Sequence, residues 1–303
     1  MILPPYLKKG DTIGLVCPAG FMAPEKWQTC AQKLQDWGFQ VQLGATMNSS
    51  SATYFSGTDE ERLKDLQGML DDEKIKAIVC GRGGYGMGRI IDQLDFKKFL
   101  RSPKWIAGFS DITVLLAHLN RVYKVASLHA PMAAAFNDGG DENKYVQSLR
   151  VALLGKKALY STPPHSFNRL GSAIGRLVGG NLSLVAHLIG TPSSYKTKGR
   201  ILFLEDVGEQ LYNIDRMFHQ LKRSGMLDGL AGLVLGGFTQ NKDTDRPFGQ
   251  TVEEILRYVL KDADYPVCYG FPVSHEKENF ALKVGAKFRL KISLDEVLLE
   301  ETD

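Results

Sequence analysis

Residues 75–90 of the chain read IKAIVCGRGGYGMGRI and join an apolar run to a glycine-rich turn. The run Ile75–Cys80 has the length and composition of a buried strand. Gly81, Gly83 and Gly86 then follow at the spacing of the G-x-G-x-x-G fingerprint found in dinucleotide-binding turns. A strand that ends in a glycine turn and continues toward a helix is typical of a βαβ unit, so this stretch predicts an open α/β sheet.

The flanking sequence repeats the same alternation of strand and helix patterns. Short apolar runs lie at residues 12–17, 40–43, 105–109 and 125–128, with helical periodicity between them. The helix before residue 75 opens with a capping box, Thr58 to Glu61. Residues 1–155 are therefore expected to form a mostly parallel sheet, and ligands of such sheets bind beyond the carboxyl ends of the strands.

The second half of the chain has a more mixed pattern. Residues 156–172 contain a Pro-Pro pair among scattered polar residues and predict a linker. Beyond it, residues 173–303 are expected to form a second domain. Apolar runs predict strands at 201–204 and 230–235 and a terminal hairpin from 284–292 and 296–299, and helical periodicity appears around 214–221 and 252–259.

Composition narrows the function classes. The 303 residues are 44% hydrophobic and 23% charged with a net charge of +3, which is typical of a soluble globular protein and disfavours nucleic acid or an anionic membrane as partner. No basic and apolar leader resembles a signal peptide, and no run approaches the roughly 18 apolar residues of a membrane span. The four cysteines lie far apart without a C-x-x-C pair, which predicts free thiols in a reducing cytosol.

The glycine turn admits three interpretations. A dinucleotide site needs a carboxylate about 20 residues further on, at the end of the next strand. Here the next strand leads to Ser110-Asp111, about 27 residues past Gly83. A turn without a ligand is the second interpretation. We favour the third, a glycine nest whose N–H groups serve an anionic centre.

Ser110 lies where the apolar run 105–109 meets a helical pattern, in the stretch WIAGFSDIT. It is either a helix N-cap or a nucleophile on a strand-to-helix elbow. Gly108 matches the first half of G-x-S-x-G, but Ile112 occupies the second glycine position, so the residues alone leave both readings open. In the nucleophile reading, the N–H of Asp111 would point at an oxyanion formed beside Ser110.

A serine nucleophile needs a base and an acid that orients it. His129 and His275 both follow predicted strands, and their spacing does not decide between them. Glu205 and Asp206 end the apolar run at 201–204, where they are either site carboxylates or charges that compensate a helix N-terminus.

Taken together, these motifs resemble the LD-carboxypeptidases of peptidase family S66, which also contains the microcin-immunity serine peptidases. The resemblance covers nearly the whole chain, through PPYLKKGDTIGLVCPAG, FSGTDEERLKDLQGMLDDEKIKAIVCGRGGYG, IAGFSDIT, GRLVGGNLSLV, LFLEDVGE…YNIDRMFHQL and GFPVSHEKEN. It implies a flavodoxin-like, class I amidotransferase-like parallel sheet domain, followed by a smaller β-rich α/β domain.

The resemblance also assigns residues. Ser110 matches the family nucleophile, Glu205 the acid and His275 the base, with oxyanion donors at the backbone N–H groups of Gly84 and Asp111. It implies that the protein needs neither a metal nor a cofactor. It also implies a cytoplasmic homodimer that releases the terminal D-alanine of murein tetrapeptides during peptidoglycan recycling.

Two further residues are candidates for substrate binding by position, Gly83 and Arg82. The family often reads His-Gly-Pro-Met where this chain has His129-Ala130-Pro131-Met132, a departure that bears on fine specificity.

Three alternatives remain from the sequence. The first is a microcin-immunity-like peptidase that hydrolyses a peptidyl-nucleotide conjugate. The others are a dinucleotide-binding protein that uses the Gly81–Gly86 loop, and an inactive domain that binds wall peptides.

Overall fold

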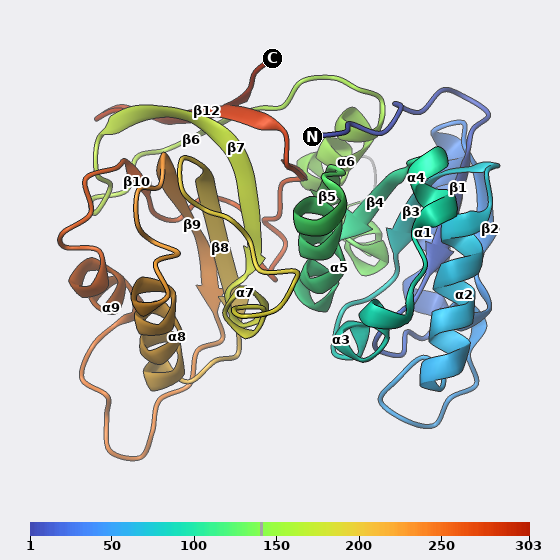
Figure 1. The fold of residues 1–303 in the computed structure, drawn as a ribbon, viewed down its shortest axis with the longest axis horizontal. Helices are drawn as coiled ribbons and strands as arrows, with labels where there is room; N and C mark the ends of the chain where they lie inside the picture. Colours follow the sequence, from blue (N-terminus) through green and yellow to red (C-terminus); the bar gives the residue numbers. More distant parts are fainter. Residues whose placement is uncertain (140–141) are drawn as a thin grey trace. The chain divides into compact units, whose positions relative to one another are not determined.

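The computed structural model of the chain describes residues 1–139 and 142–303 (Figure 1). It contains two compact units, each described here by itself. The first consists of Met1–Lys156 and Phe280–Val284, and the second of Lys157–Asn279 and Gly285–Asp303.

The first unit is built on a six-stranded sheet in the order β11-β5-β4-β3-β1-β2. The pairs among β1 to β5 are parallel, in the spatial order 2-1-3-4-5 of flavodoxin-like sheets, and β11 pairs antiparallel with β5 at the edge. The predicted parallel α/β sheet is confirmed. The strands are β1 (Thr12–Val16), β2 (Gln40–Leu43), β3 (Ile75–Cys80), β4 (Trp105–Gly108), β5 (Ser127–His129) and β11 (Leu282–Val284).

Helices cover both faces of this sheet. On β1, Ile13 and Leu15 are buried in one cluster with Cys30 and Leu34 of helix α1, whereas the missing side chain of Gly14 faces Met69 of helix α2. This alternation follows from the two-residue period of a strand. The helices are α1 (Gln28–Asp36), α2 (Asp59–Asp71), α3 (Met87–Ile90), α4 (Lys97–Arg101), α5 (Thr113–His118) and α6 (Lys144–Leu153). Short helical turns are η1 (Pro24–Lys26), η2 (Ala45–Asn48), η3 (Ile91–Gln93), η4 (Ser110–Ile112), η5 (Leu119–Tyr123) and η6 (Ala133–Asn137).

The second unit is built on a seven-stranded sheet in the order β10-β9-β8-β7-β12-β13-β6. Strands β7 to β10 pair in parallel, and β7, β12, β13 and β6 pair antiparallel, so this unit is β-rich as expected. The strands are β6 (Leu159–Thr162), β7 (Gly171–Asn181), β8 (Ile201–Val207), β9 (Gly232–Thr239), β10 (Val267–Cys268), β12 (Lys287–Ile292) and β13 (Val297–Glu301). Helices α7 (Leu182–His187), α8 (Leu211–Arg223) and α9 (Val252–Val259) pack in sequence, α7 on α8 and α8 on α9.

Two elements differ from the sequence prediction. The expected linker at 156–172 contains strand β6, whose residues alternate between exposed and buried positions and pair with β13. The expected strand at 284–292 is two strands, because Gly285 has a φ of 96° between β11 and β12. A residue in that region of φ leaves the strand conformation, and β11 joins the sheet of the first unit.

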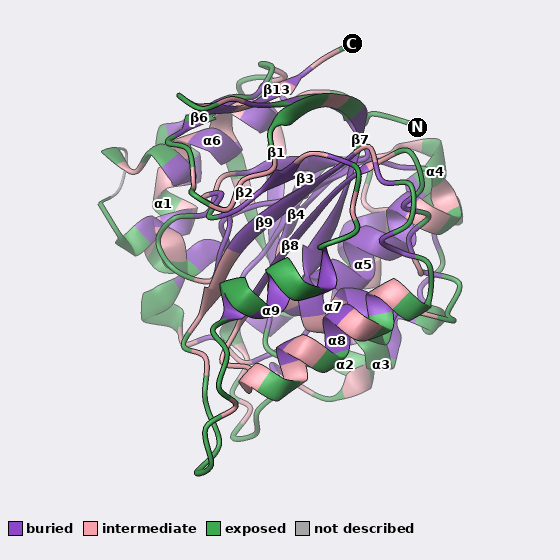
Figure 2. Ribbon diagram, turned by 90° about the vertical axis from the view of Figure 1, so that its left-hand side faces the viewer, coloured by how far each residue is buried: buried purple, intermediate pink, exposed green. Residues whose placement is uncertain are grey.

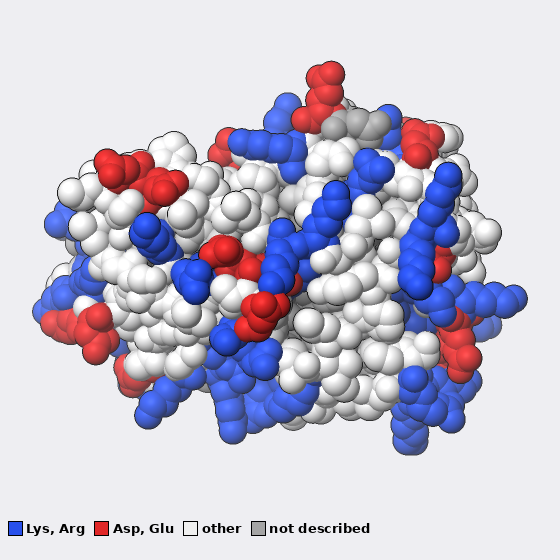
Figure 3. All heavy atoms as spheres, turned by 90° about the horizontal axis from the view of Figure 1, so that it is seen from above, with Lys and Arg blue, Asp and Glu red and all other residues white. Residues whose placement is uncertain are grey.

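The surface shows the usual division of side chains. Figure 2 shows the central strands and helix α5 buried, whereas helices such as α8 and α9 carry both buried and exposed residues. Figure 3 shows Lys and Arg scattered over the face seen from above with Asp and Glu among them, in keeping with the small net charge. Among the described residues, no helix is both long and apolar enough to cross a membrane.

Candidate active site

Ser110 occupies a strained turn at the end of β4. Its φ is 61°, in the left-handed region that residues with a Cβ seldom adopt. The extended residue Phe109 takes the N-cap position of η4 without a side-chain cap bond, so Ser110 is not the N-cap. A strained non-glycine residue on a sharp strand-to-helix turn is the geometry of a nucleophile elbow.

The elbow accommodates Ile112 because Gly108 lacks a side chain. A Cβ at Gly108 would lie 3.0 Å from Cγ2 of Ile112 and 3.2 Å from Cβ of Cys80. The isoleucine side chain therefore packs in the space left by the glycine. One small residue, two positions before the serine, is enough for this turn.

The glycine loop that follows β3 packs against the Ser110 turn. A Cβ at Gly83 would lie 2.8 Å from Cβ of Ser110, 3.0 Å from its Oγ and 3.2 Å from the backbone nitrogen of Asp111. Gly84 and Gly86 have φ values of 87° and 143°, which only glycine adopts readily. The predicted loop site thus brings backbone close to the serine, with Gly83 buried against it and Gly84 exposed.

The loop is also bonded to the segment after β1. The N–H of Gly20 donates to the carbonyl of Gly83 at 2.8 Å, and Nη1 of Arg82 donates to the carbonyl of Phe21 at 2.5 Å. The Arg82 side chain is exposed. Its placement fixes the loop and leaves the guanidinium at the surface of the first unit.

Asp111 does not serve as the carboxylate that a dinucleotide site requires. Its side chain is 2% exposed, and Oδ2 accepts the N–H of Met87 at 2.7 Å. Burial raises the pKa of this carboxyl to about 6, against the lowering effect of the Met87 N–H and of Arg62. The carboxylate is directed toward the loop backbone.

In the second unit, Glu205 and His275 form a hydrogen-bonded pair. Nδ1 of His275 lies 2.6 Å from Oε2 of Glu205, whose side chain is completely buried. Burial acts to lower the pKa of His275, but the Glu205 bond and charge, with a further contribution from Asp206, outweigh it and raise the pKa. The bond places the proton of the neutral ring on Nδ1, so Nε2 is the basic nitrogen.

Two glycines on β9 bring this pair together. The register of β8 and β9 shifts between Leu204 and Asp206, so the pairing is irregular at Glu205. A Cβ at Gly236 would lie 2.1 Å from the carbonyl oxygen of Val273, and the N–H of Gly237 donates to that oxygen at 2.9 Å. The segment that carries His275 therefore approaches β9 at a distance that only glycine permits.

Ser274 fixes the turn around His275. Its Oγ donates to the carbonyl of Glu278 and accepts the N–H of Glu276, both at 3.0 Å. These local bonds hold the backbone on both sides of the histidine.

Asp206, the second carboxylate of the predicted pair, has a different role. Oδ1 accepts from the side chain of Asn181 at 2.8 Å, and Oδ2 accepts the N–H of Ser183 at 2.9 Å, at the start of α7. Burial raises its pKa to about 6. Asp206 anchors α7, as expected for a carboxylate at a helix N-terminus, and adds negative charge near His275.

The remaining histidines have local contacts. The ring of His129, the other candidate base, is buried in β5, 5.6 Å from the ring of Phe109. The others contact neighbouring groups: His118 packs on Phe96, His165 stacks on Tyr269, His187 bonds the carbonyl of Ser183 and His219 pairs with Asp215. Within the part of the chain that the structure describes, no cluster of three or more His, Cys, Asp or Glu side chains could hold a metal ion.

Sequence reasoning missed Gly236-Gly237, Ser274 and the buried Arg62. The glycine pair at the end of an apolar run was a usable signal for a close backbone approach. Arg62 lies four and seven residues before Leu66 and Met69, so it is a charged residue on the buried stripe of α2. A charge in that position indicates a buried polar partner.

A strained serine on a strand-to-helix turn, a glycine loop against it and a histidine held by a buried carboxylate are the parts of hydrolases that act through a serine. Comparison with known proteins gives the family. Models of the LD-carboxypeptidase N-terminal and C-terminal domains match residues 13–130 and 174–290. The chain belongs to the LD-carboxypeptidase family, peptidase family S66, and is therefore a peptidase.

Three relatives indicate the range of the family. A probable murein peptide carboxypeptidase of Bacillus subtilis is 34% identical over 300 residues, which are 98% of this chain and 94% of that protein. The muramoyltetrapeptide carboxypeptidase of Oxalobacter formigenes superimposes with a TM-score of 0.87 and 28% identity, over 96% of this chain and 99% of that structure. The microcin C7 self-immunity protein MccF of Escherichia coli is 25% identical over 97% of this chain and 94% of its own length.

Proposed function

We propose that the protein is a serine carboxypeptidase that cleaves an L,D amide bond and releases the terminal D-alanine of murein tetrapeptides. The observation that carries the proposal is the 2.6 Å bond between His275 and the buried Glu205, in a chain whose other unit presents Ser110 on a strained elbow. Relatives named murein peptide and muramoyltetrapeptide carboxypeptidase support the substrate class.

In the proposed mechanism, Oγ of Ser110 attacks the carbonyl carbon and Nε2 of His275 takes the hydroxyl proton. Glu205 keeps the imidazole in its reactive tautomer and stabilises the imidazolium. The N–H groups of Gly84 and Asp111 stabilise the oxyanion. His275 returns the proton to the leaving D-alanine nitrogen, and water then hydrolyses the acyl-enzyme with the same base.

Residues of the glycine loop are proposed to bind the terminal carboxylate of the substrate and to contribute to fine specificity. We propose that Arg82 binds the terminal carboxylate: a guanidinium has five N–H donors, and the bond to Phe21 uses one of them. Gly83 leaves room for the scissile bond beside Ser110. Ala130 is completely buried within the hydrophobic core of the first unit, so its methyl group affects packing rather than substrate contact.

The wider setting follows the family resemblance. Residues 1–155 carry the nucleophile and residues 173–303 the acid and base in this proposal. The enzyme is proposed to act in the cytoplasm as a homodimer during peptidoglycan recycling, without metal or cofactor. Sedimentation of the purified protein tests the homodimer. Activity after treatment with a chelator tests whether a metal is needed.

The decisive experiment is release of D-alanine from a purified murein tetrapeptide, followed by mass spectrometry. The wild-type protein should release it, whereas Ser110→Ala and His275→Ala should reduce release by at least about 10³-fold with folding intact. A tetrapeptide that ends in L-alanine is the matched substrate control and should remain uncleaved. Full activity of Ser110→Ala would contradict the proposal.

The second candidate is hydrolysis of a peptidyl-nucleotide conjugate, which the similarity to MccF favours. Side-by-side kcat/KM values for an aspartyl-adenylate analogue and the tetrapeptide separate the two. A dinucleotide-binding protein would instead show saturable binding of nicotinamide cofactors with a rise in Tm. An inactive wall-peptide binder would bind the tetrapeptide without turnover.

A further inference from the structure

The peptide group between Gly86 and Met87 is held on both sides by buried charged side chains. Its carbonyl accepts Nη1 of Arg62 at 3.1 Å, and its N–H donates to Oδ2 of Asp111 at 2.7 Å. The Arg62 and Asp111 residues are 0% and 2% exposed. A single peptide plane, at the end of the glycine loop, is therefore fixed in orientation by a cation on one edge and a carboxyl on the other.

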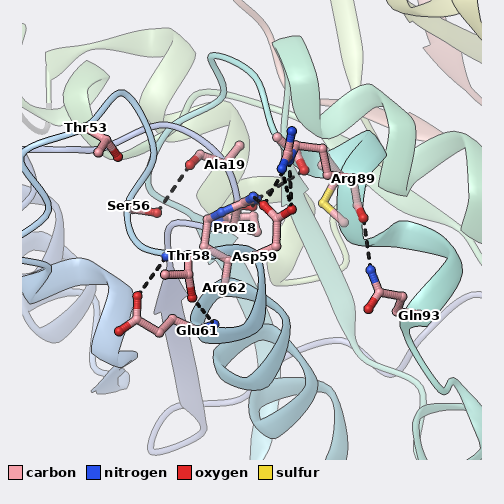
Figure 4. A network of polar contacts seen from close by, with 12 residues as sticks. Pro18, Ala19, Thr53, Ser56, Thr58, Asp59, Glu61, Arg62, Arg89 and Gln93 are labelled. Atoms are coloured by element: carbon pink, nitrogen blue, oxygen red, sulfur yellow. Dashed lines mark hydrogen bonds and ion pairs between the residues drawn. The ribbon is translucent and has the colours of Figure 1, made fainter.

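Arg62 is itself held in place from several directions (Figure 4). Nη1 also donates to the carbonyl of Pro18 at 2.6 Å, and Nη2 pairs with Asp59. Asp59 in turn binds Arg89 of α3 at 2.7 Å, which links α2 to the helix that follows the loop. Burying an arginine is costly unless its charge is paired, and here the two terminal nitrogens of Arg62 are bonded to a carboxylate and two carbonyls.

The glycine at position 86 is required by this contact. A Cβ there would lie 2.7 Å from Nη1 of Arg62, and the φ of 143° excludes most other residues. The glycine thus allows the guanidinium to reach the peptide carbonyl directly.

The clamped peptide is connected to the residues of both proposed oxyanion donors, to Gly84 along the chain and to Asp111 through its side chain. Gly84 is two residues before Gly86 in the same loop, and Asp111 supplies one donor with its own N–H while its side chain holds the loop. On the other side of Gly84, the carbonyl of Gly83 is bonded to Gly20. Both ends of the donor segment are therefore anchored.

We propose that Arg62 and the Asp111 carboxylate are positioning residues that set the separation between the Gly84 and Asp111 N–H donors. This inference rests on the proposed serine-peptidase function. Both side chains act through the Gly86–Met87 peptide, and neither touches the substrate. Their electrostatic coupling is direct, since the positive charge of Arg62 lowers the pKa of Asp111 against the effect of burial.

The test compares Arg62→Met, Arg62→Lys and Asp111→Leu with a matched control, Lys104→Met. Lys104 is 2% exposed and its Nζ bonds the carbonyls of Met69 and Asp72 at the other end of α2, so it is an equally buried cation on backbone carbonyls remote from the loop. Each variant is assayed for kcat and KM on the murein tetrapeptide, for Tm, and for the rate at which a fluorophosphonate labels Ser110.

Arg62→Met and Asp111→Leu each remove one of the two bonds that hold the Gly86–Met87 peptide, since neither new side chain can make that bond. Each should lower kcat by about 10- to 100-fold with KM within about threefold, because a displacement near 1 Å at the reacting centre costs about 10². Arg62→Lys should restore part of this loss. Lys104→Met should lower Tm and leave kcat within about twofold of the wild type. The double variant Arg62→Met/Asp111→Leu should lose much less than the product of the single losses, since both act through one peptide.

Two results would overturn the inference: folded Asp111→Leu and Arg62→Met with wild-type kcat, or an equal loss of kcat in Lys104→Met. Failure of the proposed function is recognised separately, because the wild type would then release no D-alanine. In that case, labelling of Ser110 still tests the clamp, since phosphonylation also builds negative charge on an oxygen beside the serine. Equal labelling rates in wild type and Asp111→Leu would count against it.

Discussion

The two units present their functional groups in opposite ways. In the first, the proposed groups are mostly backbone: Ser110 at a φ of 61°, the glycine loop against it and the proposed N–H donors, next to a peptide that the Asp111 side chain holds. In the second, the group is a pair of side chains, His275 on Glu205 at 2.6 Å. A site made of backbone should be sensitive to a Cβ added where the backbone makes a close contact, whereas a site made of side chains should be sensitive to a change of charge or proton.

The largest expected effect is on the side-chain pair. Glu205→Gln keeps the size of the side chain but removes the charge that holds the Nδ1–H tautomer of His275. We expect kcat for D-alanine release to fall by about 10³- to 10⁴-fold, with Tm little changed. Steady-state kinetics on the tetrapeptide measure it.

The control for that prediction is Glu276→Gln, an exposed carboxylate next to His275 in the sequence. It should keep wild-type kcat. A loss of less than about tenfold in Glu205→Gln would mean that the pair is structural rather than part of the reaction.

The next effect is on the backbone-built part. Gly83→Ala would place a Cβ 2.8 Å from Cβ of Ser110 and 3.2 Å from the Asp111 nitrogen, which must displace the loop, the elbow or both. We expect kcat to fall by about 10²- to 10³-fold, the magnitude that loss of one oxyanion donor typically produces.

Gly88→Ala is its matched control, because nothing lies within 4 Å of a Cβ at that position. It should retain activity. If Gly83→Ala keeps its activity as well, the loop is not close enough to the reaction to serve as the oxyanion site.

The sequence predicted the elements that local patterns specify. The parallel strands of the first unit, the capping box at Thr58 and the position of Ser110 at the end of β4 all follow from spacing over a few residues. Glu205 was also visible as a carboxylate in an apolar strand. These features depend on neighbours in the chain, so a single sequence contains their signal.

The remaining features depend on contacts between distant residues. From the residues alone, His129 and His275 were equivalent, and the choice rests on a bond across 70 positions that the Gly236-Gly237 approach makes possible. The clamp on the Gly86–Met87 peptide joins α2, the loop and the elbow, which no local period reveals. Strand β6 was missed because four alternating residues next to a Pro-Pro pair carry a weak signal.

A third prediction asks whether the second unit also depends on backbone approach. Gly236→Ala would place a Cβ 2.1 Å from the carbonyl oxygen of Val273, so the segment that carries His275 must move away from β9. We expect kcat to fall by about 10- to 100-fold together with a lower Tm, because the neighbouring bond from Gly237 to Val273 is strained at the same time. Thermal unfolding and kinetics measure both.

A loss of Tm without any loss of kcat in Gly236→Ala would separate the two properties. The reaction would then tolerate a displacement of the segment that carries His275. In that case only the first unit would depend on close backbone contacts for its activity, which sharpens the contrast between the two units.

The smallest effect concerns pH and the charge of Asp206. The pKa of His275 is raised above its ordinary value, so kcat/KM should fall as pH drops through that raised value, since a protonated imidazole cannot accept the Ser110 proton. Asp206 contributes to the raised value, so Asp206→Asn should move the acidic limb of the profile to lower pH. At higher pH, the plateau value of kcat/KM should change little, because Glu205 still orients the ring. This is the smallest loss of activity among the four predictions.

The direction of this shift separates two roles of Asp206. Its oxygens also anchor α7 through Ser183 and Asn181, and an asparagine can keep one of those bonds while losing the charge. If Asp206 acts on His275 only by holding α7, the variant should lose Tm and plateau rate while the limb stays in place. A limb that moves to lower pH with the plateau retained shows that the effect is electrostatic, since removing a negative charge makes the imidazolium less stable.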